Sequence, residues 1–124
     1  MNMCKVKKLK YHGKKCGKSS VAEVRGRGPM TLSLTHDETV SNTRSTTVTV
    51  SADVISAAVG FDVTKSVTRR MTGSYNVPRG KYGTLKAYPL YKRYTFKLYF
   101  LDQKYAGKGS ANKVVGYCYK HSAR

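Results

Sequence analysis

The sequence has no tryptophan, only three prolines, and six acidic residues against 24 lysines and arginines. It has no apolar run long enough for a transmembrane helix, so we expect no helical membrane span. The first twenty residues, MNMCKVKKLKYHGKKCGKSS, are basic but lack the apolar stretch that a secretory signal peptide needs. We therefore expect a protein that stays in the cytoplasm, is released without a classical signal, or is a mature form.

Groupings of catalytic or metal-binding residues are also absent. The three histidines lie in polar or basic stretches, and the six acids are too scattered for a carboxylate dyad. Residues 36–38 (HDE) read as a solvated turn rather than a metal site. Cys4, His12, Cys16 and His121 are permitted zinc ligands, but no closely spaced cysteine pair accompanies them. We expect no enzymatic activity, no cofactor and no metal.

The three cysteines are an odd number, which does not indicate a disulfide framework. Cys4 and Cys16 can pair with each other, or all three thiols can stay reduced. The sequence leaves both arrangements open.

The net charge of +18 is unevenly distributed. Residues 1–28 hold nine basic residues and one acid, residues 29–78 hold four of each, and residues 79–124 hold eleven basic residues and one acid. Two cationic ends of this kind favour a polyanionic partner, either nucleic acid or an anionic membrane surface. The candidate polyanion-binding residues are Lys5, Lys7, Lys8, Lys10, Lys14, Lys15, Lys18, Arg79, Lys81, Lys86, Lys92, Arg93 and Lys97.

Period-two alternation of apolar and polar residues dominates the chain and predicts strands. We expect an all-β fold with a single domain of long antiparallel strands, arranged as a sandwich or an elongated sheet. Residues 1–28 are predicted to be a basic N-terminal arm, and residues 29–124 the β domain. The expected strands are 5–11 (short), 30–34, 39–54, 55–77, 83–88, 94–100 and 113–120, with turns at 26–29 and 77–83, a ladder break or sheet edge at Pro89, and a loop at 103–113.

The alternation changes phase once, between Val54 and Ile55. A one-residue slip sends every later side chain to the opposite face, so we expect a bulge or bend there, in preference to a tight reversal. The rival interpretation is a short helix over ADVISAAVGF. We favour a strand because Gly60 and the β-branched residues around it are poor helix formers.

The stretch KYGTLKAYPLYKRYTFKLYF, residues 81–100, combines aromatic rings with cations. Such a strand can stack on unpaired bases, anchor at a lipid boundary, or simply alternate core and solvent positions. Phe96, Leu98 and Phe100 fit the core as well as they fit a contact surface. The better candidates for surface contact are Tyr82, Tyr88, Tyr91, Tyr94 and Tyr99. The glycine-flanked cations in GRG (26–28) and GKG (107–109) are able to touch phosphates, but read first as ordinary exposed turns.

The order SNTRSTTVTVS, AAVGFDVTKSVT, SYNVPRGKYG and YKRYTFKLYF resembles the pore-forming module of aerolysin-type, epsilon-toxin-like β-pore-forming proteins. The resemblance covers about residues 38–100, with motifs at 45–51 and 77–80 and a looser match at 59–61. It implies that a segment at 52–67 inserts into the membrane and that copies oligomerise into a barrel. The implied membrane-inserting residues are Val54, Ile55, Val59, Phe61 and Val63.

The resulting prediction is a non-enzymatic cationic β-protein that binds anionic membranes and forms a homo-oligomeric pore. One alternative is a protein that binds RNA or single-stranded nucleic acid through the same cations and the tyrosines. Another is a structural assembly subunit of a shell or fibre with basic arms, which pairs through exposed strand edges.

Overall fold

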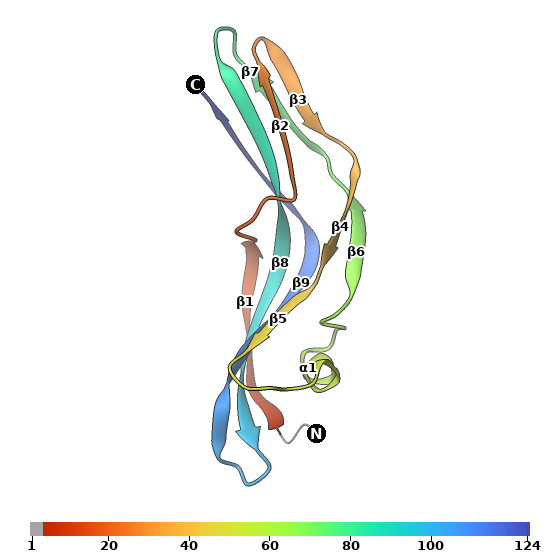
Figure 1. The fold of residues 1–124 in the computed structure, drawn as a ribbon, viewed down its shortest axis with the longest axis vertical. Coiled ribbons are helices and arrows are strands. Elements are labelled where there is room, and N and C mark those ends of the chain that lie inside the picture. The colour runs from red at the N-terminus through yellow and green to blue at the C-terminus, as the bar shows by residue number, and fades with distance from the viewer. Residues whose placement is uncertain (1–3) are drawn as a thin grey trace. The chain divides into compact units, whose positions relative to one another are not determined.

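The computed structural model describes residues 4–124 and is built mostly of strands (Figure 1). Its elements are β1 (Cys4–Cys16), β2 (Ala22–Arg27), β3 (Met30–Leu34), β4 (Asp37–Ser41), β5 (Thr43–Thr46), α1 (Ala52–Val59), β6 (Ser66–Arg70), β7 (Gly73–Val77), β8 (Tyr82–Phe100) and β9 (Tyr105–Ala123). The prediction of a β fold with long antiparallel strands is confirmed at this level.

The strands form one five-stranded sheet and two ribbons. The sheet has the order β1-β8-β9-β5, and β2 pairs antiparallel with β8. The ribbons are β3 with β7 and β4 with β6. In register, Ala22 lies opposite Ala87, Met30 opposite Val77, and Thr43 opposite Asn112.

The described chain forms two compact units, each assembled from three separate stretches. The first unit comprises residues 1–15, 41–67 and 91–114, of which 1–3 lie outside the described residues. The second comprises residues 16–40, 68–90 and 115–124. Each unit has its own apolar core. Each core forms only when the separate stretches of its unit come together.

The core of the first unit is built around Ile55, Val63, Phe96 and Ala111, all buried. Helix α1 supplies Ile55 and covers this cluster together with half-buried neighbours such as Val59. The core of the second unit contains Leu32, Leu34, Met71, Val77, Leu85 and Ala87.

The expected bulge or bend that joins strand 39–54 to strand 55–77 is wrong, because helix α1 occupies Ala52–Val59. Ser51 caps the helix, with its side chain accepting a hydrogen bond from the Val54 N–H. Gly60 ends it at φ 86°, a left-handed conformation that glycine adopts readily, and its N–H donates to the Ser56 carbonyl. The change of phase at Val54 and Ile55 therefore lies inside the helix, where a period of two no longer applies, and Gly60 is a helix stop.

The long strands β8 and β9 also differ from expectation. Pro89 does not interrupt β8. Near this residue the partner strand on one side of β8 changes from β2 to β1. The Pro89 carbonyl accepts the Gly17 N–H at 2.7 Å. The missing N–H of Pro89 falls at the change of partner, because the β2 register ends at Ala87 and β1 ends at Cys16. The expected loop at 103–113 is mostly strand, because β9 begins at Tyr105. The turn after Val77 is confirmed, with Gly80 at φ 79°.

The predicted basic arm is not seen in the described part of residues 1–28. Residues 4–16 form strand β1, which pairs with β8, and residues 22–27 form β2. Pairing with β8 satisfies backbone groups that a free arm would leave to water.

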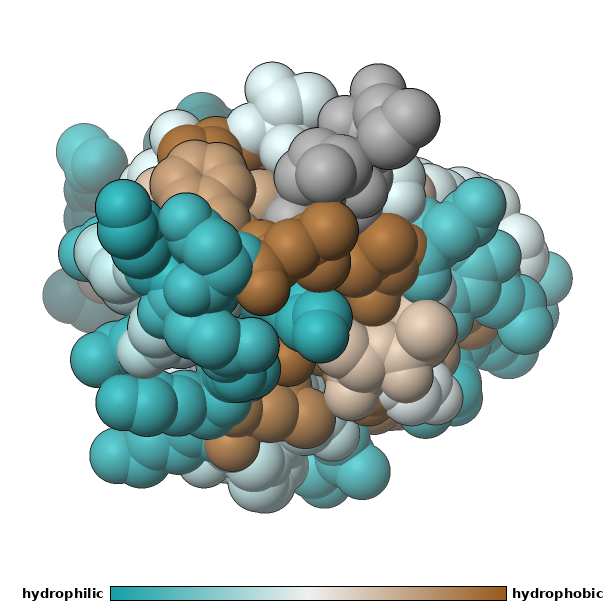
Figure 2. Space-filling view, turned by 90° about the horizontal axis from the view of Figure 1, so that it is seen from below, coloured by the Kyte–Doolittle hydropathy of each residue, from teal (hydrophilic) through white to brown (hydrophobic). Residues whose placement is uncertain are grey.

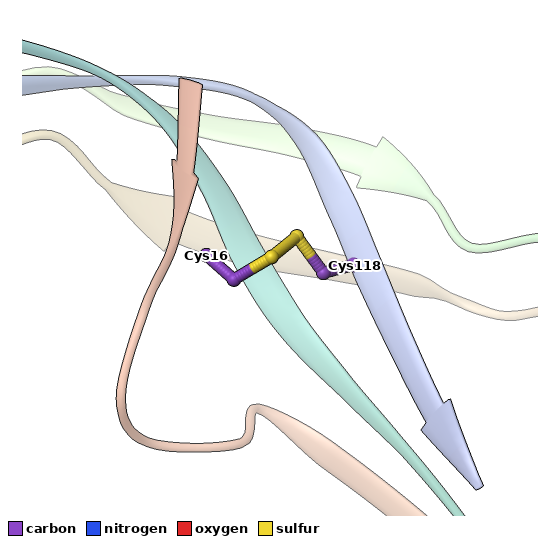
Figure 3. Close-up of a disulfide and its surroundings, with 2 residues drawn as sticks. All are labelled: Cys16 and Cys118. Atoms are coloured by element: carbon purple, nitrogen blue, oxygen red, sulfur yellow. A yellow bond between two sulfur atoms is a disulfide. The ribbon is translucent and has the colours of Figure 1, made fainter. Parts of the chain in front are cut away.

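A disulfide joins Cys16 at the end of β1 to Cys118 in β9, both in the second unit (Figure 3). The candidate Cys4–Cys16 pairing is therefore wrong, as is the arrangement with three reduced thiols. The two bonded residues are 102 positions apart in sequence, so no local pattern indicated the pair.

Candidate anion-binding pocket

A pocket of about 510 Å³ lies within the first unit and is lined by residues of all four strands of the β1-β8-β9-β5 path. Its lining residues are Lys8, Lys10, Ser45, Thr46, Thr47, Arg93, Thr95, Phe96, Lys97, Lys108, Gly109 and Ser110. Five of these residues are cationic, five carry hydroxyl groups, and none of the described lining residues is acidic. The pocket therefore offers positive charge and hydroxyl groups without a neutralising carboxylate.

Strand alternation explains how β8 contributes to this pocket. Arg93, Thr95 and Lys97 are two residues apart, so they share one face of the strand. Phe96 alternates with them and is buried in the core cluster, so it borders the pocket from the core side. A Cβ atom at Gly109 would collide with the ring of Phe96, so glycine at this position lets β9 lie against the pocket floor.

Lys108 is held in place through its backbone. The Thr47 N–H donates to the Lys108 carbonyl at 3.0 Å, and the Lys108 N–H donates to the Thr47 hydroxyl at 3.0 Å. This pairing extends β5 by one residue beside β9. It fixes the position of the Lys108 backbone. Lys108 is exposed and lines the pocket.

Lys8 departs from regular strand geometry. Its φ of 56° is left-handed, a conformation that most side chains avoid. Consecutive strand residues normally point to opposite faces. Here the ammonium groups of Lys7 and Lys8 lie 5.6 Å and 6.0 Å from the centroid of the same ring, Tyr99. The distorted backbone thus brings two adjacent lysines to one side of β1.

Of the thirteen predicted polyanion-binding residues, four line the pocket, namely Lys8, Lys10, Arg93 and Lys97. Lys7 lies beside Tyr99, as described above. Lys86, in the second unit, has its ammonium 3.3 Å from the Glu23 carboxylate, which also accepts a hydrogen bond from Arg25. The Arg25 hydrogen bond, with Lys86 contributing, lowers the pKa of Glu23. The remaining candidates, which do not line the pocket, are Lys5, Lys14, Lys15, Lys18, Arg79, Lys81 and Lys92.

Ser45 and Thr46 of β5 were not among the candidates predicted from the sequence, and Lys108 was noted only as a cation able to touch phosphates. Lys108 was assigned to an exposed basic turn, but it belongs to β9. Its flanking glycines were the available signal. At Gly107, as at Gly109, a Cβ atom would meet another residue, here the Thr47 hydroxyl. Only the strand pairing brings these residues together.

The five candidate contact tyrosines all belong to β8, and within the first unit Tyr94 lies on the opposite face of the strand from Tyr91 and Tyr99. Tyr82 and Tyr88 belong to the second unit, and the other three to the first. The Tyr94 ring contacts two other rings, those of Tyr11 at 5.1 Å and Phe61 at 5.7 Å. Burial raises the pKa of Tyr91. Tyr82 is 45% exposed.

The candidate membrane-inserting residues do not lie on one amphipathic strand. Ile55 and Val63 are buried, Val59 and Phe61 pack against the same core, and Val54 is half-buried. The segment after α1 is a turn in which the Asp62 carboxylate accepts hydrogen bonds from the Thr64 N–H and hydroxyl. These bonds lower the pKa of Asp62.

Among the described residues, no group of three or more His, Cys, Asp or Glu side chains is placed to hold a metal ion. In the same part of the chain, no helix combines the length and the apolar character needed to cross a membrane. Neither a protein-family model nor a curated protein matches the sequence.

Proposed function

We propose that this protein binds anionic membrane surfaces and that the pocket of the first unit holds phosphate groups of the lipid heads. The observation that carries the proposal is the concentration of Lys8, Lys10, Arg93, Lys97 and Lys108 around one pocket without a described acid. Mutually repelling cations are stabilised by an anionic ligand. Serine hydroxyls beside them, Ser45 and Ser110, add neutral polar groups, whereas the Thr46 and Thr47 hydroxyls already donate to the Val48 and Lys108 carbonyls.

Two observations favour a lipid surface over nucleic acid. In the first unit, Tyr94 lies on the opposite face of β8 from Tyr91 and Tyr99, so these three rings do not share one stacking surface of the kind that unpaired bases use. The Cys16–Cys118 disulfide is typical of oxidising compartments outside the cytosol. Membrane insertion by residues 52–67, oligomerisation and pore formation stay predictions, as does the absence of enzymatic activity.

The proposal is tested by vesicle co-sedimentation at several salt concentrations. The pocket variant Arg93→Gln/Lys97→Gln/Lys108→Gln is compared with a control, Arg27→Gln/Arg70→Gln/Arg124→Gln, of equal net charge. The control residues are exposed and belong to the second unit. We expect wild type and control to bind phosphatidylserine-containing vesicles but not pure phosphatidylcholine, and the pocket variant to bind at least tenfold more weakly.

Equal weakening of both variants would show that total charge, not the pocket, drives binding. Binding to polyuridine is measured in parallel. If RNA binding survives at 0.2 M salt while vesicle binding does not occur, the lipid proposal is wrong and the nucleic-acid alternative replaces it.

A further inference from the structure

The turn between β8 and β9 carries three exposed large hydrophobic residues within six positions. Phe100 is 44% exposed, Leu101 51% and Tyr105 56%. All three belong to the first unit, the unit that contains the pocket. Figure 1 shows this turn at the lower end of the drawing, and Figure 2, seen from below, shows hydrophobic surface bordered by hydrophilic residues.

Hydrogen bonds hold the turn in one conformation. The Phe100 N–H donates to the Lys104 carbonyl at 2.8 Å, and the Gln103 N–H donates to the Phe100 carbonyl at 2.9 Å. The Lys7 ammonium donates to the Gln103 side-chain oxygen at 2.6 Å, which ties the turn to β1. A turn fixed in this way loses little conformational entropy when it binds.

Cations flank the apolar residues in the sequence. Lys104 lies within the turn, and Lys97 and Lys108 lie three residues before Phe100 and three residues after Tyr105. The one acid in the turn is Asp102, whose carboxylate accepts the Lys104 N–H at 3.0 Å. An apolar turn bordered by lysines is complementary to the boundary between anionic head groups and acyl chains.

We propose that the β8–β9 turn inserts Phe100 and Leu101 into the interfacial layer of an anionic bilayer, with Tyr105 at head-group depth. This inference rests on the proposed function, because the pocket cations bring the protein to the surface. It adds an apolar contact that charge attraction alone does not supply. A nucleic acid is a poorer match, since its phosphate backbone has no apolar layer to receive Leu101.

The absence of tryptophan provides a direct test. Leu101→Trp places a single fluorophore in the turn, and Phe100→Trp places one next to it. The matched control is Tyr82→Trp, at the other end of β8, where Tyr82 is 45% exposed and belongs to the second unit. Each variant is mixed with phosphatidylserine–phosphatidylcholine vesicles, with and without brominated acyl chains.

We expect the emission of Leu101→Trp to shift to the blue by about 10 nm or more and to be quenched by brominated lipid, while the control changes little. Vesicle binding without a shift or quenching at either turn position would overturn the insertion and leave the proposed function standing. Absence of vesicle binding would overturn both. A blue shift that appears without vesicles when the protein concentration is raised would assign the turn to contact with a second copy and also overturn the proposal.

Discussion

At the scale of single residues, hydrogen bonds from side chains join strands that are far apart in sequence. The Tyr117 hydroxyl in β9 lies 2.8 Å from the Glu38 carbonyl in β4 and 2.9 Å from the Arg69 carbonyl in β6. In the first unit, Asn42 donates to the Asp62 carbonyl and accepts the Val114 N–H. Such contacts fix the ribbons against the long strands.

Tyr117 predicts a pH dependence of stability. Burial, with a smaller effect of Glu38, raises its pKa above the usual value. The unfolded state therefore ionises first as pH rises, so the contribution of Tyr117 is complete below about pH 10 and is lost as pH passes through the folded-state pKa.

We expect Tyr117→Phe to lower the free energy of unfolding by about 1 kcal/mol at neutral pH, because the hydroxyl donor is lost. It should also reduce the decline in stability above pH 10. Urea unfolding at several pH values measures both effects, with Tyr82→Phe as an exposed control. If the stability of Tyr117→Phe declines above pH 10 as much as that of wild type, the decline does not come from Tyr117.

At the scale of elements, capping residues decide where helix α1 begins and ends. Helix α1 is eight residues long and lies in a stretch rich in Val and Ala. Its two ends are fixed by Ser51 and Gly60. In the sequence Gly60 counted against a helix, because glycine destabilises helix interiors. In the structure Gly60 lies at the helix end, a position that glycine favours.

Gly60 should be replaceable only by residues that tolerate a left-handed conformation. A Cβ atom there would meet no atom within 4 Å, so the cost of substitution is conformational. We expect Gly60→Ala to lower the free energy of unfolding by about 1 kcal/mol and Gly60→Asn to lower it less. Urea unfolding compares the two variants, and equal losses would show that φ at this position does not set the cost.

Over the whole molecule, charge and the disulfide act on all segments together. A net charge of +18 favours expansion of the chain by self-repulsion. The Cys16–Cys118 bond opposes this expansion, because it closes a loop with a sequence separation of 102. Cross-linking distant residues restricts the unfolded chain more than the folded one.

Removing this disulfide should lower stability strongly. In the chain-entropy treatment a loop of this length contributes about 4–5 kcal/mol. We expect Cys16→Ser/Cys118→Ser, or wild type in reductant, to unfold at a much lower temperature, measured by circular dichroism. Reductant should have no further effect on the double variant. An unchanged midpoint would mean that the bond does not constrain the unfolded state.

The sequence by itself determined the β character, the strand with Leu32 and Leu34 buried, and the turn at Gly80. These features depend on local alternation and on the conformational preferences of proline and glycine, which act between near neighbours. It also determined the excess of cations and their segregation to both ends of the chain.

Only the tertiary structure decided which cations share a pocket, which cysteines bond, and which apolar residues stay exposed. Phe96 and Phe100 occupy equivalent alternating positions, yet one is buried and the other 44% exposed, because Phe100 is the last residue of β8 before the turn. Lys8, Arg93 and Lys108 meet only because β1, β8 and β9 pair. Pairing between strands far apart in sequence depends on the packing of the whole chain, so a local sequence pattern does not predict it.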